Sequence, residues 1–177
     1  YFRQSLRAPI EQLLGESARS HGFSRWGGKF VRLQGAHGLF LKWLFPDCRM
    51  LFLTRNPWDA WNSYRGESWF YTWPDVRVSE VKQFAHIWQH TMRSFICCPH
   101  DSSMMVRYED ILKRGEKYKE VVAHCQLGAI DESTFDHRIG GFAKSSGGIT
   151  SREVEQIQEI CGPLAAEFGY HGFRQSD

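Results

Sequence analysis

Apolar residues recur at helical spacing along several segments of this chain. Between residues 2 and 19, apolar side chains lie three or four positions apart with charged residues between them, which predicts an amphipathic helix. The same spacing predicts further helices over residues 36–45, 79–97, 116–125 and 151–168. The last helix begins with Thr150-x-x-Glu153, which has the form of a capping box, and Gly169 is expected to end it.

Two apolar runs have the length of β-strands. Met50–Thr54 is unbroken in its apolar character, as is typical of a strand covered on both faces, and Met104–Tyr108 is the second candidate. Because predicted helices separate these runs, the strands are expected to be joined by crossovers into a mostly parallel sheet. The pattern therefore predicts an α/β layered fold.

The segment after the first strand predicts a tight turn and a helix start. Asn56 is a good N-cap, Pro57 suits the first helical position, and Asp59 at the third position is placed to reach back to the cap. A helix that starts at the carboxyl end of a parallel strand directs its free backbone N–H groups and its positive dipole end toward the binding crevice of the sheet. An anion site is expected there.

Two side chains suit that anion site. Arg55 lies at the junction and offers a planar fork to a phosphate, while Ser63, seven residues after Asn56, returns to the same helical face with a hydroxyl group. The residues alone leave a second interpretation open, in which Arg55 forms a structural ion pair and Ser63 is an ordinary helix serine.

Composition narrows the possible functions. The chain has 177 residues and 42% hydrophobic residues, which suits one globular domain or a large piece of one. Its 22 Lys and Arg residues and 20 Asp and Glu residues give a formal net charge of +2. This net charge is too small to indicate a protein that binds nucleic acid or a membrane surface. No apolar run approaches the roughly 20 residues that span a bilayer. The five cysteines fit no zinc spacing, so we expect reduced, packing cysteines and no metal.

Four segments, in order along the chain, resemble sulfotransferases that use 3′-phosphoadenosine 5′-phosphosulfate (PAPS). "FPDCRMLFLTRNPWDAWNSY" (Phe45–Tyr64) resembles the family's 3′-phosphate-binding segment. The others are "RWGGK" (Arg25–Lys29), "VRYEDIL" (Val106–Leu112) and "CGPLAAEFGY" (Cys161–Tyr170). The resemblance implies a three-layer, parallel-sheet, P-loop-like sulfotransferase fold. Residues 1–177 would then form a single partial domain that moves a sulfuryl group from PAPS to a hydroxyl or amine acceptor.

The resemblance also implies roles for individual residues. It assigns Arg55 and Ser63 to the 3′-phosphate and Tyr108 to the adenosine, where core packing is the alternative for the tyrosine. Asp59 matches the family pattern with a capping role, and Glu109 is expected to order the turn after its strand together with its neighbour Asp110. A family loop before the last helix corresponds to "FAKSSGG", where the phosphate contacts would be Lys144, Ser145 and Ser146. A flexible Ser/Gly loop is the alternative there.

The chain departs from the family pattern in its donor and catalytic parts. No Gly/Ser/Thr-rich loop follows an apolar strand ahead of Arg55, so the N-terminal β-loop-α unit is missing and is expected upstream of Tyr1. Lys29 matches a family lysine near the transferred group, although Gly28 replaces the usual Glu before it. His37 is a candidate general base. A Glu on the helix after the missing loop is the alternative base.

Several questions stay open at this stage. A degenerate, non-enzymatic nucleotide-binding or interaction module of the same fold competes with the enzyme, and a different P-loop-type transferase or kinase is a third interpretation. The acceptor is a carbohydrate, a peptide, a lipid or another small molecule. A cytoplasmic enzyme fits the unpaired cysteines, whereas an enzyme of the Golgi lumen would carry a membrane anchor upstream.

Overall fold

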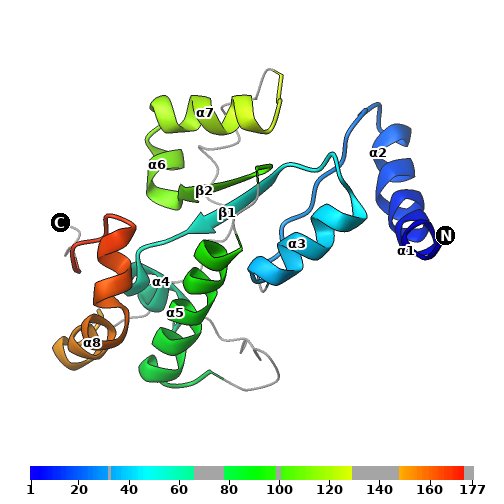
Figure 1. Cartoon of the computed structure of the whole chain (residues 1–177). Helices are drawn as coiled ribbons and strands as arrows, with labels where there is room; N and C mark the ends of the chain where they lie inside the picture. Colours follow the sequence, from blue (N-terminus) through cyan, green and yellow to red (C-terminus); the bar gives the residue numbers. More distant parts are fainter. Residues whose placement is uncertain (32, 66–77, 99–100, 129–147, 174–177) are drawn as a thin grey trace.

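The computed structural model describes residues 1–31, 33–65, 78–98, 101–128 and 148–173. At its centre lies a two-stranded parallel sheet of β1 (Met50–Thr54) and β2 (Ser103–Arg107), with helices around it (Figure 1). Met50 pairs with Ser103 and Thr54 with Arg107, so both strands end at the same edge. The predicted α/β class and parallel pairing are confirmed for this part of the chain. The candidates Lys144, Ser145 and Ser146 lie outside the described residues.

The five helices predicted from apolar spacing are present, and α4 follows the predicted cap, but α6 was not predicted, because Tyr108 begins this helix and does not end β2. The predicted N-terminal helix is one continuous rod whose middle turn is a π-helix, η1. After Ser20 the chain turns at Gly22, where a φ of +81° suits glycine. The helices are α1 (Phe2–Ile10), η1 (Glu11–Gly15), α2 (Glu16–Ser20), α3 (Gly35–Leu44), α4 (Pro57–Tyr64), α5 (Val81–Cys97), α6 (Tyr108–Leu112), α7 (Glu116–His124) and α8 (Ser151–Glu167).

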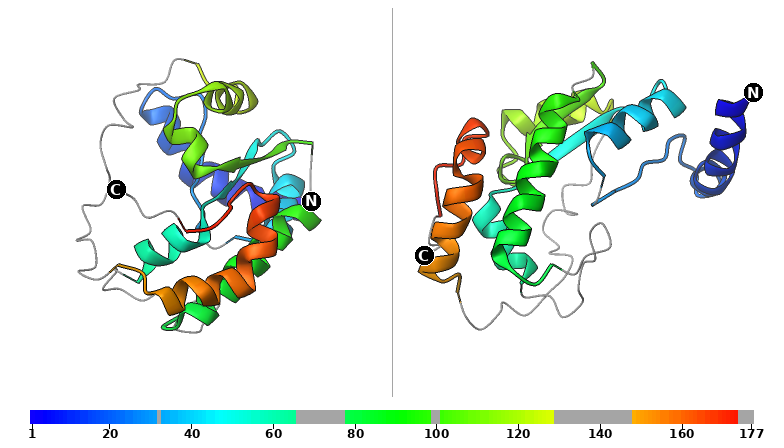
Figure 2. Two further views of the ribbon diagram at one scale, coloured as in Figure 1. Left: turned by 90° about the vertical axis from the view of Figure 1, so that its left-hand side faces the viewer. Right: turned by 60° about the horizontal axis from the view of Figure 1, so that its bottom comes forward.

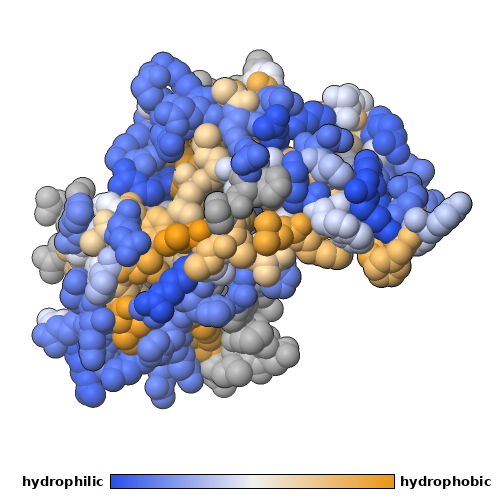
Figure 3. Space-filling view, viewed as in Figure 1, coloured by the Kyte–Doolittle hydropathy of each residue, from blue (hydrophilic) through white to orange (hydrophobic). Residues whose placement is uncertain are grey.

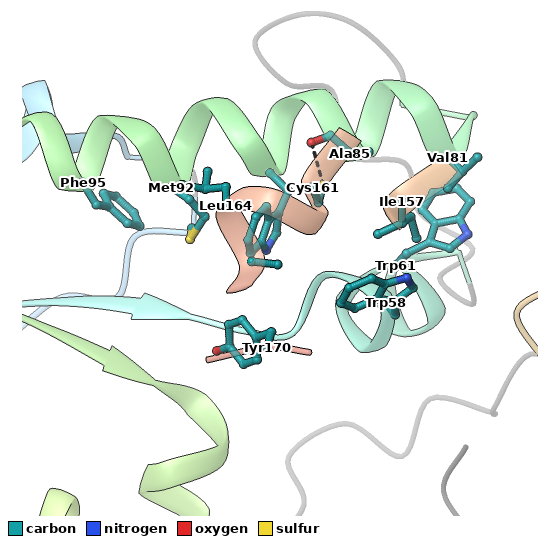
Figure 4. Close-up of a cluster of buried hydrophobic side chains, with 12 residues drawn as sticks. Trp58, Trp61, Val81, Ala85, Met92, Phe95, Ile157, Cys161, Leu164 and Tyr170 are labelled. Carbon is teal, nitrogen blue, oxygen red and sulfur yellow. Dashed lines mark hydrogen bonds between the residues drawn. The ribbon is translucent and has the colours of Figure 1, made fainter. Parts of the chain in front are cut away.

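One face of the sheet is buried beneath α5 and α8 together with α4. Phe52 of β1 stacks on Phe95 of α5 with ring centroids 4.6 Å apart. Three tryptophans, Ile157 and Cys161 lie in the same apolar cluster, and the thiol of Cys161 donates to the carbonyl of Ala85 at 3.3 Å (Figure 4). Burial raises the pKa of this thiol to about 12. It therefore packs as a neutral group, as the sequence predicted for its cysteines.

The other face of the sheet is covered over β2 but not over β1. Val106 of β2 is buried, as are Tyr118 and Val121 of α7, which packs on this strand. Leu51 and Leu53 point to the same side as Val106 because paired positions share a face, yet they are 38% and 45% exposed. The prediction that both faces of β1 are covered is therefore wrong for the part of the chain that the structure describes. An apolar run indicates that a strand tends to be buried, but it does not indicate which element covers the strand.

The N-terminal helical rod lies to one side of the sheet (Figure 2). It contacts the body at α3, where the rings of Phe2 and Trp43 are 6.5 Å apart. Apolar atoms gather on the surface over α3, where Leu39, Phe40 and Trp43 are exposed (Figure 3). No helix in the described part of the chain is long and apolar enough to cross a membrane.

Small residues let α3 lie close to its neighbours. The amide of Gly35 donates to Ser94 Oγ of α5 at 3.0 Å, and a Cβ atom on Gly35 would collide with the Ser94 carbonyl oxygen. A Cβ atom on Gly38 would lie 3.0 Å from the ring of Phe52. The position of α3 against α5 and β1 therefore depends on glycine at both sites.

We predict that Gly35→Ala lowers the free energy of unfolding by about 1–3 kcal/mol, because the added methyl group must push α3 away from α5. Urea unfolding followed by circular dichroism measures this change. Gly27→Ala is the matched control, since a Cβ atom there meets nothing within 4 Å. An equal, small effect of both substitutions would contradict the close approach of α3 and α5.

Candidate functional site

A chain of hydrogen bonds joins the carboxyl ends of the two strands. Thr54 is fully buried, and its hydroxyl lies 3.4 Å from the carbonyl of Val106 and 3.0 Å from the hydroxyl of Tyr170. Tyr170 donates to Glu109 Oε2 at 3.0 Å, and Glu109 Oε1 accepts from the amide of Asn56 at 3.0 Å. The start of α4, the start of α6 and the segment after α8 are thereby tied together.

The first turn of α4 is capped as the sequence predicted, with one difference. Asn56 Oδ1 accepts from the amides of Trp58 and Asp59 at 3.0 and 3.2 Å, and Pro57 occupies the first helical position. The prediction that Asp59 reaches back to the cap is wrong, because Glu109 from the neighbouring strand end takes the Asn56 amide instead. The Asp59 carboxylate has no hydrogen bond within the described ranges.

The backbone of this helix start offers no unused donor to an anion. Pro57 has no N–H group, the next two amides are bonded to the Asn56 side chain, and the amide of Ala60 donates to the Asn56 carbonyl at 2.9 Å. The predicted cradle of free N–H groups is therefore absent from the first turn, since Asn56 already satisfies it. An anion here would be held by side chains, with the helix dipole adding to their attraction.

Arg55 and Tyr108 lie together at this edge of the sheet. The guanidinium carbon of Arg55 is 5.3 Å from the centroid of the Tyr108 ring, and Tyr108 is 37% exposed. The indole N–H of Trp88 donates to the Arg55 carbonyl at 3.0 Å and fixes its backbone. Among the residues that the structure describes, none forms an ion pair with Arg55. In the described part of the structure, Arg55 therefore forms no structural ion pair, and Tyr108 is not packed in the core.

Ser63 and Asp59 share the outer face of α4. They are four residues apart, and Ser63 is exposed. Burial raises the pKa of Asp59, the charge of Arg55 opposes this rise, and the charge of Glu109 adds to it. The charges of Arg55 and Glu109 therefore act on the Asp59 carboxyl in opposite directions, and among the described residues no ion pair joins Asp59 to Arg55.

The turn after β2 is ordered by its own charges, as expected from the sequence. Arg107 and Asp110 form an ion pair at 2.6 Å, and this hydrogen bond lowers the pKa of Asp110. The Arg107 guanidinium carbon also lies 5.9 Å from the centroid of the Tyr170 ring, and Gly169 before it has a φ of +77°. Burial raises the pKa of Tyr170, so its hydroxyl stays protonated and donates to Glu109.

Neither predicted catalytic residue is joined to this site by a described contact. Lys29 is exposed on the segment between α2 and α3. His37 is exposed in the first turn of α3, where its Nδ1 accepts from the amide of Gln34 at 3.1 Å. The start of α3 contacts α5 at Ser94, which is six residues and therefore about 9 Å along the helix from Trp88, whose indole bonds to the Arg55 carbonyl. Both roles stay predictions.

A separate depression of about 490 Å³ lies at the opposite, amino ends of the strands. Two basic and two acidic side chains contribute to its lining, so its charge is balanced. The lining residues are Lys42, Pro46, Asp47, Arg49, Asp101, Ser102 and Gln126. We place the candidate site at the carboxyl ends instead, because Arg55 has no acidic ion-pair partner there among the described residues.

Sequence reasoning missed the pairing of Thr54 with Tyr170. The two residues are 116 positions apart, and although each lies in a segment that resembles the sulfotransferase family, neither segment indicated that they would meet. The available signal was a threonine at the end of an otherwise apolar strand, since a buried hydroxyl needs a partner.

Comparison with known proteins gave no relatives. No protein-family model matches this chain, and no match was found among curated proteins or solved structures. In the described ranges, no three His, Cys, Asp or Glu side chains are grouped as metal ligands would be.

We predict that Tyr170→Phe lowers the free energy of unfolding by about 1–3 kcal/mol, because it leaves a carboxylate oxygen of Glu109 without its partner and leaves the buried Thr54 hydroxyl only its longer bond to the Val106 carbonyl. Urea unfolding measures the loss. Tyr108→Phe removes an exposed tyrosine hydroxyl that forms no hydrogen bond with the described residues, and it is expected to cost less than about 0.5 kcal/mol. If the two variants are equally stable, the hydrogen-bond chain is not a determinant of stability.

Proposed function

We propose that this chain is part of a PAPS-dependent sulfotransferase domain and binds the 3′-phosphate of the nucleotide at the carboxyl end of β1. The observation that carries the proposal is Arg55, a half-buried guanidinium without an ion pair among the described residues, held at the start of α4 beside an exposed aromatic ring. The position agrees with the family role expected from the sequence. For the fold, the proposal is a three-layer, P-loop-like domain.

The described side chains fit a nucleotide 3′-phosphate and an adenosine. Arg55 provides the charge and the planar donors that a phosphate needs, and Ser63 presents a hydroxyl on the outer face of α4. Tyr108 presents an exposed ring edge or face for the base or ribose. Since the first-turn amides are already bonded, these side chains would carry the binding.

The uncovered side of β1 supports the fold-level proposal. Leu51 and Leu53 are exposed on one face, and in the described part of the chain β2 is the strand paired with β1. A further β-loop-α unit, with its strand beside β1 and its helix over these leucines, would bury them and complete a third layer. Its loop would lie at the carboxyl end of its own strand, next to Arg55.

Transfer of the sulfuryl group requires binding, charge stabilisation and a base. PAPS supplies the activated sulfuryl group, and the acceptor is a hydroxyl or an amine. Within this chain, Arg55 would hold negative charge on the departing nucleotide. Lys29 and His37 are retained as proposals for the transferred group and for the acceptor proton.

A non-enzymatic nucleotide-binding module is the second candidate, favoured by the engagement of His37 in the cap of α3. Transfer of radiolabelled sulfate from PAPS to a panel of carbohydrate, peptide and phenolic acceptors separates the two candidates. Activity of the longest encoded chain supports the enzyme. Nucleotide binding without any transfer supports the module.

We predict that Arg55→Ala weakens binding of adenosine 3′,5′-bisphosphate by about 10- to 100-fold while AMP binding changes little, because only the first nucleotide carries a 3′-phosphate. Isothermal titration calorimetry measures both affinities. Arg93→Ala, on an exposed position of α5, is the charge-matched control and is expected to leave both affinities unchanged. Equal losses for the two nucleotides in Arg55→Ala would contradict the assignment.

A further inference from the structure

One peptide group at the candidate site is held at both of its polar ends. It joins Arg55 to Asn56, directly after β1. The Arg55 carbonyl accepts from the indole N–H of Trp88 at 3.0 Å, and the Asn56 amide donates to Glu109 Oε1 at 3.0 Å. Because a peptide group is planar and its carbonyl and amide point to opposite sides, these two bonds together fix the orientation of its plane.

Both side chains that hold this peptide group come from distant segments. Trp88 lies on α5 and is buried, and Glu109 lies in the first turn of α6. They are 33 and 53 positions away from the residues that they bind. The orientation of the peptide group after Arg55 is therefore set by the packing of α5 and α6, and not only by the residues around it.

The turn that ends α8 contacts both of these side chains. The rings of Phe168 and Trp88 are nearly perpendicular, with centroids 6.4 Å apart. Two residues later, Tyr170 lies beside the end of β1 and donates to the second oxygen of Glu109 at 3.0 Å (Figure 4). Gly169 between them has a φ of +77°, which a residue with a side chain rarely adopts. One short turn therefore supports both partners of the peptide group.

We propose that Trp88 and the turn of residues 168–170 are positioning residues for the anion site. They fix the peptide group that follows Arg55 and so hold its guanidinium, 5.3 Å from the centroid of the Tyr108 ring, ready for a phosphate. The proposal rests on the proposed 3′-phosphate site. A cation that is already in place loses less conformational freedom when the ligand arrives, so its loss of position weakens binding.

The bond from Trp88 to the Arg55 carbonyl is separable from the packing of the ring. The ring lies in the apolar cluster beneath α5 and α8, and burial alone accounts for its place there. The indole N–H is its one polar group, and its acceptor belongs to the residue that offers the charge. Trp58 lies in the same cluster and makes the equivalent bond to the carbonyl of Val154 at 3.2 Å. Trp58 is therefore a matched reference for Trp88.

The first test compares Trp88→Phe with Trp58→Phe. Each substitution removes one indole N–H and keeps an aromatic ring in the cluster. Calorimetry measures the affinities for adenosine 3′,5′-bisphosphate and for AMP. We expect Trp88→Phe to lower the ratio of these affinities by about three- to tenfold, as for the loss of a hydrogen bond, and Trp58→Phe to keep the wild-type ratio. A merely structural role would lower the urea midpoint of unfolding without changing this ratio.

A second measurement follows Arg55 directly and needs no ligand. The Nε–H signal of Arg55 in nitrogen–proton NMR is shifted by the ring current of Tyr108 while the guanidinium stays over the ring, and Arg55→Lys identifies this signal. We expect Trp88→Phe to move the signal toward that of a freely exposed arginine. Phe168→Leu removes the perpendicular ring contact and is expected to move it in the same direction by a smaller amount. Trp58→Phe is expected to leave it in place.

These measurements distinguish failure of the positioning role from failure of the proposed function. If Trp88→Phe leaves the Arg55 signal and the affinity ratio as in wild type, or if Trp58→Phe changes both equally, the positioning role is overturned and the phosphate site stands. If Arg55→Ala leaves binding of the bisphosphate unchanged, the phosphate site itself fails, and the positioning role fails with it. Circular dichroism checks the folding of each variant, and Phe168→Leu keeps the test decisive if Trp88→Phe does not fold.

Discussion

Glu109 accepts hydrogen bonds from the Asn56 amide and the Tyr170 hydroxyl, and this pair of bonds determines how the candidate site is assembled. Asn56 follows Arg55 directly, and Glu109 follows Tyr108 directly. The bond between Asn56 and Glu109 therefore brings Arg55 and Tyr108 together, with the Arg55 guanidinium over the Tyr108 ring. Hydrogen bonds to an ionised carboxylate are stronger than neutral ones, which suits a contact that joins two strand ends.

Two tryptophans attach the inner face of α4 to the core, while the outer face of the helix takes no part in this packing. The indole N–H of Trp58 donates to the carbonyl of Val154 at 3.2 Å, and that of Trp61 donates to Glu153 at 2.9 Å. Both rings are buried in the cluster beneath α5 and α8. Because two large side chains fix the inner face of this short helix, its outer face is held in place for Asp59 and Ser63.

The sequence predicted local features and missed those that depend on distant segments. Apolar spacing and the residues at helix ends are local, so both strands, the Asn56 cap, the stop at Gly169 and every helix except the short α6 were predictable. The partner of the Asn56 amide was not, because Glu109 becomes its neighbour only when the strands pair. The apolar run of β1 likewise contained no information on what covers Leu51 and Leu53. The relation of Lys29 and His37 to the site depends on a connecting segment without a repeating pattern.

Tyr170 also has a consequence for the order of folding. Its bond to Thr54 spans 116 positions, whereas the helices form from neighbours in sequence. Contacts between distant residues require the closure of a long loop and form late. Glu109 therefore gains its second partner only after α8 has docked. During synthesis on the ribosome, β1, α4 and β2 would emerge well before Tyr170, so the hydrogen bonds that join the strand ends would be completed only after α8 has been made.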